Sequence, residues 1–275
     1  MPQPTSHSAR YLHAFQGLLL RDLYVLRREL LPFVIRICMN PLLFLFVFTY
    51  IMPHMSAGAN PTTALASSSG GFGTVILPGL MAVAIMFSGI AAVALPLAQE
   101  FGVTREIDDR VMCPLPVSFV ALEKIFFSAM QSVLAAIVVF PLAYYIPTVP
   151  VQVHVTSWLF LIAVVALASL TAGALGLVIG TSVKPQQIGL IFGVVIMPIT
   201  FLGCVYYPWA GLKYIPWLKY FVLINPIVYM SEGLRASLTP TLPSMPHVAI
   251  LIMLTVSLVI LSAVGIRGFK HRVIG

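Results

Sequence analysis

The chain has 275 residues, of which 60% are hydrophobic and only 8% are charged, and its mean hydropathy is +1.02. A soluble domain carries about 25% charged residues, so a water-soluble fold of this composition is excluded. Disorder is excluded as well, because disordered chains are poor in apolar residues. The sequence therefore predicts an all-α integral membrane protein. Attraction to anionic lipid explains the net charge of +7 without any nucleic acid partner.

Six membrane spans are predicted from the spacing of the charged residues. Clusters of charge are separated by four uncharged stretches, at 37–99, 125–183, 185–212 and 236–266. One helix needs about 20 residues to cross a bilayer, so the first two stretches hold two spans each and the last two hold one each. The predicted spans, within one transmembrane domain covering 1–275, are 32–53, 74–98, 125–146, 156–181, 187–206 and 247–267.

The first predicted element, before these spans, is an amphipathic helix at 8–31. Its apolar residues recur every three or four positions and form one stripe. The stripe consists of Leu12, Phe15, Leu19, Leu23, Leu26 and Leu30. Basic residues, among them Arg21, Arg27 and Arg28, occupy the remaining surface. Such a helix lies in the headgroup plane of a membrane; the alternative is a solvated helix packed on another protein.

The connection between the second and third spans, 99–117, is dense in charge. Its charged residues are Glu100, Arg105, Glu106, Asp108, Asp109 and Arg110. The charges over 104–110 predict a short exposed helix, which Pro114 and Pro116 end. So much charge in one loop of a membrane protein indicates a docking surface for another protein, with a merely solvated loop as the alternative.

Small residues four positions apart occur in two predicted spans. The fourth span contains Ala172, Gly176 and Gly180, and the fifth begins with Gly189 and Gly193. This spacing lets helix backbones approach closely. Packing within one subunit is favoured over a seam between two copies.

Residues 207–240 are too apolar for a solvated loop and too long for a simple connection. Pro208, Pro216 and Pro226 divide the stretch into short pieces. Asn225 is the predicted N-cap of the helix that follows, and Glu232 and Arg235 have the spacing to pair on it. We expect short helices that enter the outer leaflet and return, packed against protein.

The orientation follows from the distribution of Lys and Arg. With six spans, both termini lie on one side, together with 12 of the 15 Lys and Arg residues. Positive charge accumulates on the cytoplasmic side. The sequence therefore predicts a multi-pass protein of the cell (inner) membrane with both termini in the cytoplasm.

The known motifs for soluble catalysis are missing from the sequence. It has no phosphate-binding G-x-x-x-x-G-K-[ST], H-E-x-x-H, C-x-x-C or G-x-S-x-G, so no catalytic residue and no metal site is predicted. Apart from Arg36, no predicted span carries a charge in its body, which disfavours a proton relay. The pattern indicates one subunit of an externally driven machine. An ion-coupled secondary carrier or channel, and a membrane enzyme using Glu232 and Arg235 on lipids, are the alternatives.

Two motifs resemble those of ABC-2 type transporter permeases, and the resemblance covers nearly the whole chain. The first runs from Glu100 through Thr104-Arg-Glu106 and Pro114-Leu-Pro116 to Glu123-Lys124. The second comprises Gly203 to Pro208, Ile215-Pro216, Asn225-Pro226-Ile-Val-Tyr229, Glu232 and Arg235. Val103 and Ile215 depart from the residues usual at their positions without undermining the assignment.

The resemblance implies the membrane subunit of an exporter of the drug-resistance or nodulation-factor type. Its partners would be two ABC ATPase subunits, a second permease copy or paralogue, and membrane lipid. ATP and Mg²⁺ would bind to the ATPases, with no cofactor in this chain. The residues implied in coupling to the ATPases are Glu100, Thr104, Arg105, Glu106, Asp108, Asp109, Arg110, Pro114 and Pro116. The N-terminal helix with Arg21, Arg27 and Arg28 would contact the same partner, and the apolar spans favour a lipophilic or lipid-linked cargo.

Overall fold

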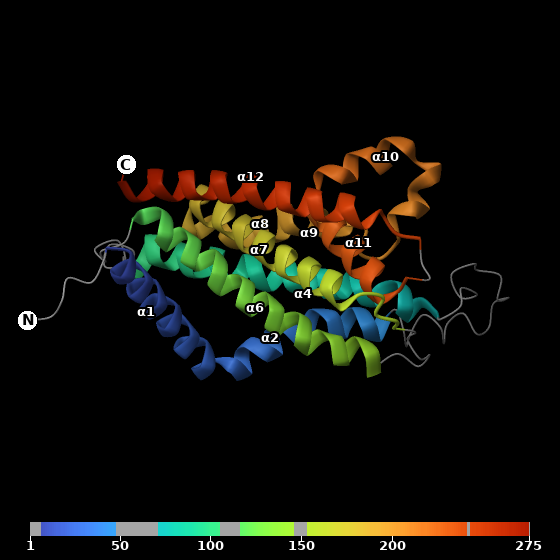
Figure 1. Cartoon of the computed structure of the whole chain (residues 1–275), viewed down its shortest axis with the longest axis horizontal. Helices are drawn as coiled ribbons and strands as arrows, with labels where there is room; N and C mark the ends of the chain where they lie inside the picture. The colour runs from blue at the N-terminus through green and yellow to red at the C-terminus, as the bar shows by residue number, and fades with distance from the viewer. Residues whose placement is uncertain (1–6, 48–70, 105–115, 146–152, 241–242, 275) are drawn as a thin grey trace, which may run out of the picture.

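The computed structural model describes residues 7–47, 71–104, 116–145, 153–240 and 243–274, and within them every regular element is helical. This confirms the all-α fold. The longer helices are α1 (His7–Arg28), α2 (Leu30–Leu45), α4 (Gly71–Gln99), α6 (Val117–Tyr145), α7 (Trp158–Ser182), α11 (Pro226–Leu238) and α12 (His247–Ile274). They form an elongated bundle (Figure 1). We call the end where α1 begins and α12 finishes the termini end.

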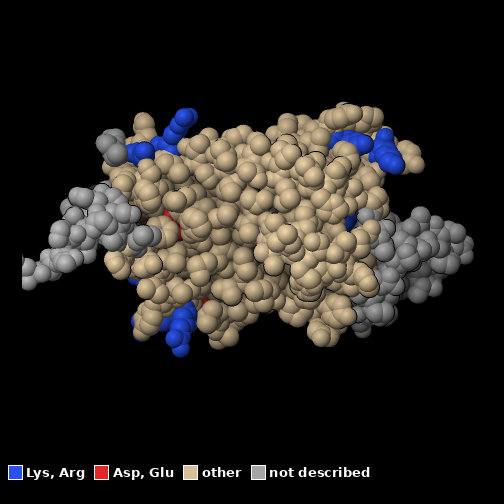
Figure 2. All heavy atoms as spheres, viewed as in Figure 1, with Lys and Arg blue, Asp and Glu red and all other residues tan. Residues whose placement is uncertain are grey.

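Four helices in the described ranges, α4, α6, α7 and α12, are long and apolar enough to cross a membrane. They cover the predicted spans 74–98 and 247–267 and nearly all of 125–146 and 156–181, since α6 ends at Tyr145 and α7 begins at Trp158. Helix α12 continues beyond the last predicted span. Of two shorter apolar helices, Leu30–Met39 begins two residues before the first predicted span, 32–53, and overlaps its start, and Ile188–Phe201 lies within the fifth. Lys and Arg gather toward the two ends of the bundle and leave the middle of the visible face uncharged (Figure 2). The number of spans stays a prediction.

Helix α4 is the centre of the bundle and packs against α6, α7 and α11. Most of its side chains are buried, and Ile76, Leu80, Ile85, Met86 and Ile90 are among those with no exposure. Pro78 and Pro96 lie inside the helix, where the neighbouring helices supply the packing that a membrane helix with proline needs. Helix α4 therefore joins the two ends of the molecule through its core.

Close contact between α4 and α7 depends on the small residues of α7. A Cβ atom at Gly176 would lie 2.9 Å from Cα of Ile90, and one at Gly180 would lie 3.2 Å from Cα of Ala94. The prediction of packing within the subunit is therefore right for this pair. It is wrong for Gly189 and Gly193, because no atom lies within 4 Å of the position of a Cβ at either residue.

The fifth predicted span, 187–206, is a broken helix that ends early. A 3-10 turn (Pro185–Gln187) leads into α8 (Ile188–Ile191), a π-helical turn (Phe192–Ile196) and α9 (Met197–Phe201). Pro198, the second residue of α9, has no N–H to donate, which is consistent with the widened turn before it. The chain then turns at 202–207 instead of continuing as a helix to 206.

Other helices also begin or end at residues that differ from the predicted ones. Helix α1 ends at Arg28 and α2 begins at Leu30, so the amphipathic helix stops short of 31, and Leu30 is 43% exposed rather than part of the buried stripe. Helix α6 begins at Val117, directly after Pro116, and not near 125. As a result, Glu123 and Lys124 lie in its buried first turns instead of on a loop.

We predict opposite effects of alanine at two glycines. Gly176→Ala forces the α4 and α7 backbones apart and is expected to lower the free energy of unfolding by about 1–3 kcal/mol. The Cβ that Gly193→Ala adds has no neighbouring atom within 4 Å. We expect this variant to leave the free energy of unfolding unchanged or slightly higher, since alanine favours helix. SDS titration of the purified chain in mixed micelles measures both. Equal effects would contradict the packing described here.

Candidate functional site

The predicted docking connection begins as a π-helical turn that extends α4 from Glu100 to Thr104. Glu100 is buried, and its Oε1 accepts a hydrogen bond of 2.7 Å from Nζ of Lys124 on α6, which is also buried. Glu100 was predicted to belong to the docking connection, but its side chain lies inside the bundle, and its role in coupling stays a prediction. Because α6 begins before Lys124, this side chain packs against the end of α4 and pairs there with Glu100.

Helix α12 holds the same turn from another direction. The ring of Phe101 lies 6.1 Å from that of Phe269, and the guanidinium carbon of Arg272 lies 4.7 Å from the Phe101 ring centroid. Nη1 of Arg272 also donates to the carbonyls of Gly180, Thr181 and Val183 at 3.1, 3.2 and 2.8 Å, at the C-terminus of α7. The sequence analysis missed this role of Arg272. The available signal was a basic residue near a helix end, where carbonyls lack partners.

Most residues of the predicted coupling motif lie outside the described residues, namely Arg105, Glu106, Asp108, Asp109, Arg110 and Pro114. Thr104 ends the π-helical turn. Pro116 is exposed directly before α6, and its carbonyl accepts from the N–H of Phe119 at 2.8 Å. Coupling through these residues stays a prediction.

Helix α1 crosses beside the first half of α6 at the termini end. Its Phe15 makes an edge-to-face contact with Phe126 of α6, with 6.3 Å between the ring centroids. The buried residues of α1 are Leu18, Asp22 and Leu26, four positions apart, so the buried face includes an acidic residue that the predicted apolar stripe does not contain. The three predicted partner-contacting residues, Arg21, Arg27 and Arg28, are exposed.

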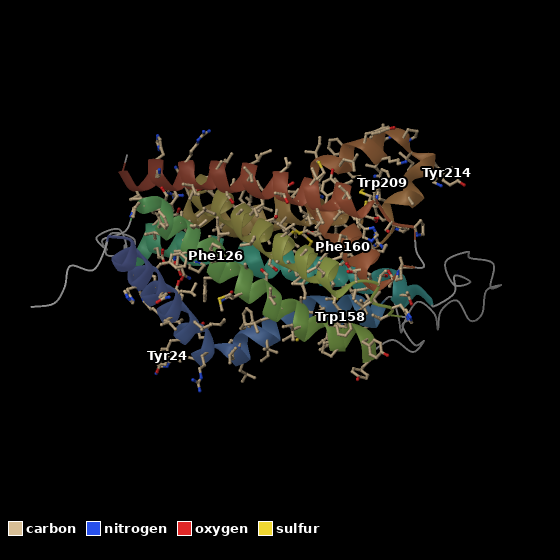
Figure 3. All side chains as sticks on the ribbon, in the orientation of Figure 1. Tyr24, Phe126, Trp158, Phe160, Trp209 and Tyr214 are labelled. Atoms are coloured by element: carbon tan, nitrogen blue, oxygen red, sulfur yellow. The ribbon has the colours of Figure 1, made fainter. Side chains whose placement is uncertain are left out.

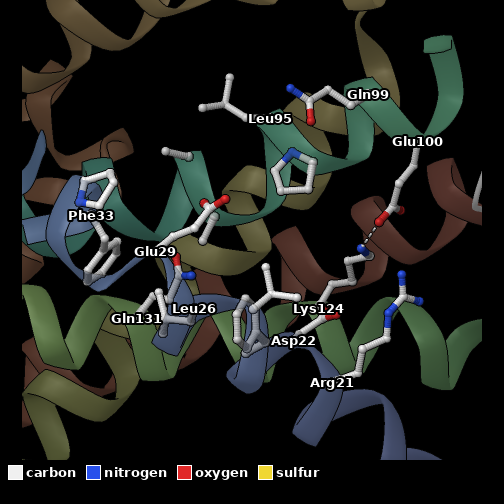
Figure 4. Close-up of a pocket in the computed structure, with 16 residues that line it drawn as sticks. Arg21, Asp22, Leu26, Glu29, Phe33, Leu95, Gln99, Glu100, Lys124 and Gln131 are labelled. Carbon is white, nitrogen blue, oxygen red and sulfur yellow. Dashed lines mark hydrogen bonds and ion pairs between the residues drawn. The ribbon is translucent and has the colours of Figure 1, made fainter. Parts of the chain in front are cut away.

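A cavity of about 610 Å³ lies between these elements (Figure 4). Helices α1, α2, α4 and α6 line it, and its polar residues are Arg21, Asp22, Glu29, Gln99, Glu100, Lys124 and Gln131. Gln131 was not predicted to belong to a site. The available signal was a glutamine inside a predicted span, because a polar side chain is costly to place in a bilayer and usually has a function there.

A second cavity of about 430 Å³ lies nearer the middle of the bundle. Residues of α2, α4, α8 and the π-helical turn after it form its walls, and nearly all of them are apolar. Ser88 of α4 is the exception, and its buried Oγ has no hydrogen-bond partner. Both volumes are in the range of small-molecule sites in proteins.

The opposite end of the bundle is organised around a buried ion pair. Glu232 and Arg235, on α11, pair at the predicted spacing, and both are fully buried. The carboxylate of Glu232 also accepts from the N–H of Trp209 at 3.0 Å and of Met245 at 3.3 Å. Glu232 therefore ties both connections that flank α11 to the helix.

Side chains at α11 also satisfy the backbone at the broken end of the fifth segment. Nδ2 of Asn225 donates to the Ile199 carbonyl at 2.6 Å, Oγ of Ser231 to that of Gly203 at 2.7 Å, and Nη2 of Arg235 to that of Cys204 at 3.1 Å. Cys204 has φ of 53°. This left-handed conformation costs about 1–3 kcal/mol in a residue other than glycine, and the charged donor at its carbonyl offsets the cost.

The other motif residues of 207–240 lie at the joints between short helices. Pro208 precedes the 3-10 helix Trp209–Tyr214, Pro216 opens α10 (Pro216–Phe221), and Pro226 opens α11 behind its N-cap Asn225. The hydroxyl of Tyr229 donates to the Leu223 carbonyl at 2.8 Å. Figure 3 shows Trp209 and Tyr214 at this end, away from Tyr24 of α1.

The sequence model of the ABC-2 type transporter family matches residues 13–239. That range contains the residues that line both cavities, the π-helical turn after α4, and the Glu232–Arg235 pair with its partner Trp209. No curated protein matches the chain.

We predict strong coupling between Glu232 and Arg235. Either Glu232→Gln or Arg235→Gln leaves one buried charge without its counter-ion and is expected to cost about 3–5 kcal/mol of unfolding free energy. The double variant is expected to cost clearly less than the sum of the two. SDS titration in mixed micelles measures the cycle, and additive losses would show that the two side chains act independently.

A second pair of variants separates the two roles of Asn225. Asn225→Ser keeps a hydroxyl that can cap the Ile227 N–H but removes the amide donor to Ile199, whereas Asn225→Ala removes both. We expect Asn225→Ala to be the less stable of the two by about 1 kcal/mol, the usual value of an N-cap. Equal stability, measured in the same titration, would mean that the cap contributes nothing here.

Proposed function

Because the chain belongs to the ABC-2 type transporter family, we propose that it is the permease subunit of an ATP-driven exporter of lipophilic or lipid-linked substrates. Membership makes the chain the membrane component of an ABC transporter, which associates with ABC ATPase subunits. The match over residues 13–239 carries the proposal. Export, the class of cargo and two ATPases per complex are the further steps that we propose.

The termini end faces the cytoplasm and the ATPases in this proposal. The π-helical turn at Glu100 lies there, and exposed Arg21 of α1 lines the same cavity as Glu100. The turn continues α4. Lys124 of α6 pairs with its Glu100, and α12 contacts its Phe101 through Phe269 and Arg272. A partner that binds ATP and Mg²⁺ and pushes on this segment therefore acts directly on the central helix.

A second permease copy or paralogue completes the transport path. Helix α2 and the α8–α9 region expose large apolar residues, including Leu31, Ile35, Leu43, Leu190 and Val194. Gly189 and Gly193 leave open space on the same region, and the second cavity lies between α2, α4 and α8. A neighbouring subunit on this side closes that cavity.

Association with an ATPase is the first test. The tagged chain, extracted from its native membrane in mild detergent, is expected to bring with it a protein that carries a G-x-x-x-x-G-K-[ST] loop. Reversing the charges of Glu106, Asp108 and Asp109 to Lys is expected to reduce its recovery at least tenfold without loss of the chain from the membrane. Lys213→Glu, at the far end of the bundle, is the control.

Transport by proteoliposomes that contain the purified complex is the second measurement. ATP on the side of the ATPases is expected to drive movement of a lipophilic probe across the bilayer. Movement that needs an ion gradient and no ATP would replace the proposal with an ion-coupled secondary carrier.

A further inference from the structure

The two cavities meet on one face of α4. Ala91 and Leu95 line both of them. From Val83 in the apolar cavity to Glu100 in the charged one, α4 rises by about 25 Å, which is most of the thickness of a hydrocarbon core. The joined space is therefore polar at the termini end and apolar toward the middle of the bundle.

Charge is unevenly distributed within the polar cavity. In Figure 4, Arg21 and Lys124 lie with Glu100 at one side, and Glu29 and Gln131 lie together at the other. Lys124 is held by Glu100 at 2.7 Å. Among the described residues that line the cavity, the side with Glu29 and Gln131 therefore presents acceptors without a cation beside them.

The side-chain carbonyl of Gln131 points to a ligand-binding site on this side of the cavity. Its side chain is 8% exposed, and its Oε1 has no hydrogen-bond partner. A buried acceptor without a donor costs free energy, so its persistence in a bilayer protein points to a donor from a ligand. Glu29 follows the last residue of α1 and adds a carboxylate next to it.

The apolar cavity begins at the same place. Phe33 lies near Glu29 (Figure 4), and one turn further along α2 Ile37 lines the second cavity. From there the walls are apolar except for Ser88, which is 5% exposed and whose Oγ has no partner. A chain of methylene groups fits these walls, whereas a second charged group does not.

We propose that the joined cavities bind a single-chain amphiphile with a primary ammonium head. The head donates hydrogen bonds to the Glu29 carboxylate and to Oε1 of Gln131, and its alkyl chain passes Ala91 and Leu95 into the cavity lined by Ile37 and Phe87. The proposal rests on the proposed transport function and specifies its cargo. Glu29 is exposed where it borders the cavity, so its carboxylate would repel an anionic head, and a neutral head would form no ion pair with it.

The test measures binding of tritiated dodecylamine to the full-length chain in nanodiscs, with empty nanodiscs subtracted. Unlabelled dodecylamine is expected to compete at least tenfold better than dodecanol or dodecanoate, which have the same chain length and a neutral or an anionic head. Glu29→Gln and Gln131→Leu are each expected to weaken binding about tenfold, the usual effect of losing one hydrogen bond to a charged group.

Two matched controls separate binding from general damage to the bundle. Gln187→Leu makes the same exchange as Gln131→Leu at an exposed residue outside both cavities. Ser169→Ala removes a buried hydroxyl that, like that of Ser88, has no partner, but lines neither cavity. Both are expected to bind dodecylamine as the parent chain does, and Ser88→Ala is expected to weaken binding less than Gln131→Leu.

Saturable binding that is unchanged in Glu29→Gln and Gln131→Leu would overturn the proposal, because the amine would then only be partitioning into the bilayer. Preference for dodecanoate would also overturn it and would assign the cavity to anionic lipid. Both outcomes leave the proposed function intact, since association with the ATPase is measured separately. Loss of that association with dodecylamine binding retained would overturn the proposed function and keep the site.

Discussion

The structure depends on one constraint, that backbone carbonyls inside a bilayer have to be hydrogen-bonded by protein. The fifth segment breaks at Phe201 and frees the carbonyls of Gly203 and Cys204. Side chains of α11 donate hydrogen bonds to these carbonyls. Arg235 is the costliest of these donors to bury, because its charge has no exposure to solvent. Glu232 neutralises that charge, and its carboxylate also accepts hydrogen bonds from the N–H groups of Trp209 and Met245. One ion pair therefore fixes a turn, a helix and both flanking connections.

Helix α4 connects this network with the other end of the bundle. Near its start, a Cβ at Gly79 would overlap the carbonyl of Val205, which follows Cys204 in the turn that α11 supports. At its other end, α4 continues into the π-helical turn of Glu100, which Lys124 and Phe269 hold. Since interiors are close-packed and transmit strain, we expect displacement of the Glu100 turn to reach the turn at Val205 through α4. The buried glycines suit this role because they bring α4 into backbone contact with its neighbours.

Local patterns predicted what depends on local chemistry. Apolar runs located the long helices, and the prolines at 208, 216 and 226 marked the joints between the short helices of 207–240, because both signals act within a few residues. The pair of Glu100 and Lys124 could not be predicted, since its members lie 24 positions apart and meet only once α4 and α6 pack. The cavity face of α4 was equally hidden. Nearly all its residues are apolar on every side, so its hydrophobicity has no helical period. Only packing against α6, α7 and α11 separates the packed face from the face that lines the cavities.

That division of α4 has a functional consequence. Its packed face, with Gly89, Ile90 and Ala94, adjoins the small residues of α7, whereas Phe87, Ala91 and Leu95 line open space. A helix that is rigid on one side and bordered by a cavity on the other can be moved without losing its own packing, because only the open side has to change. The polar residues at the termini end of that space lie beside the segment that meets the ATPase in our proposal. In that proposal, cargo binding and the contact with the ATPase act on the same helix, and α4 is the physical route from ATP binding to the substrate.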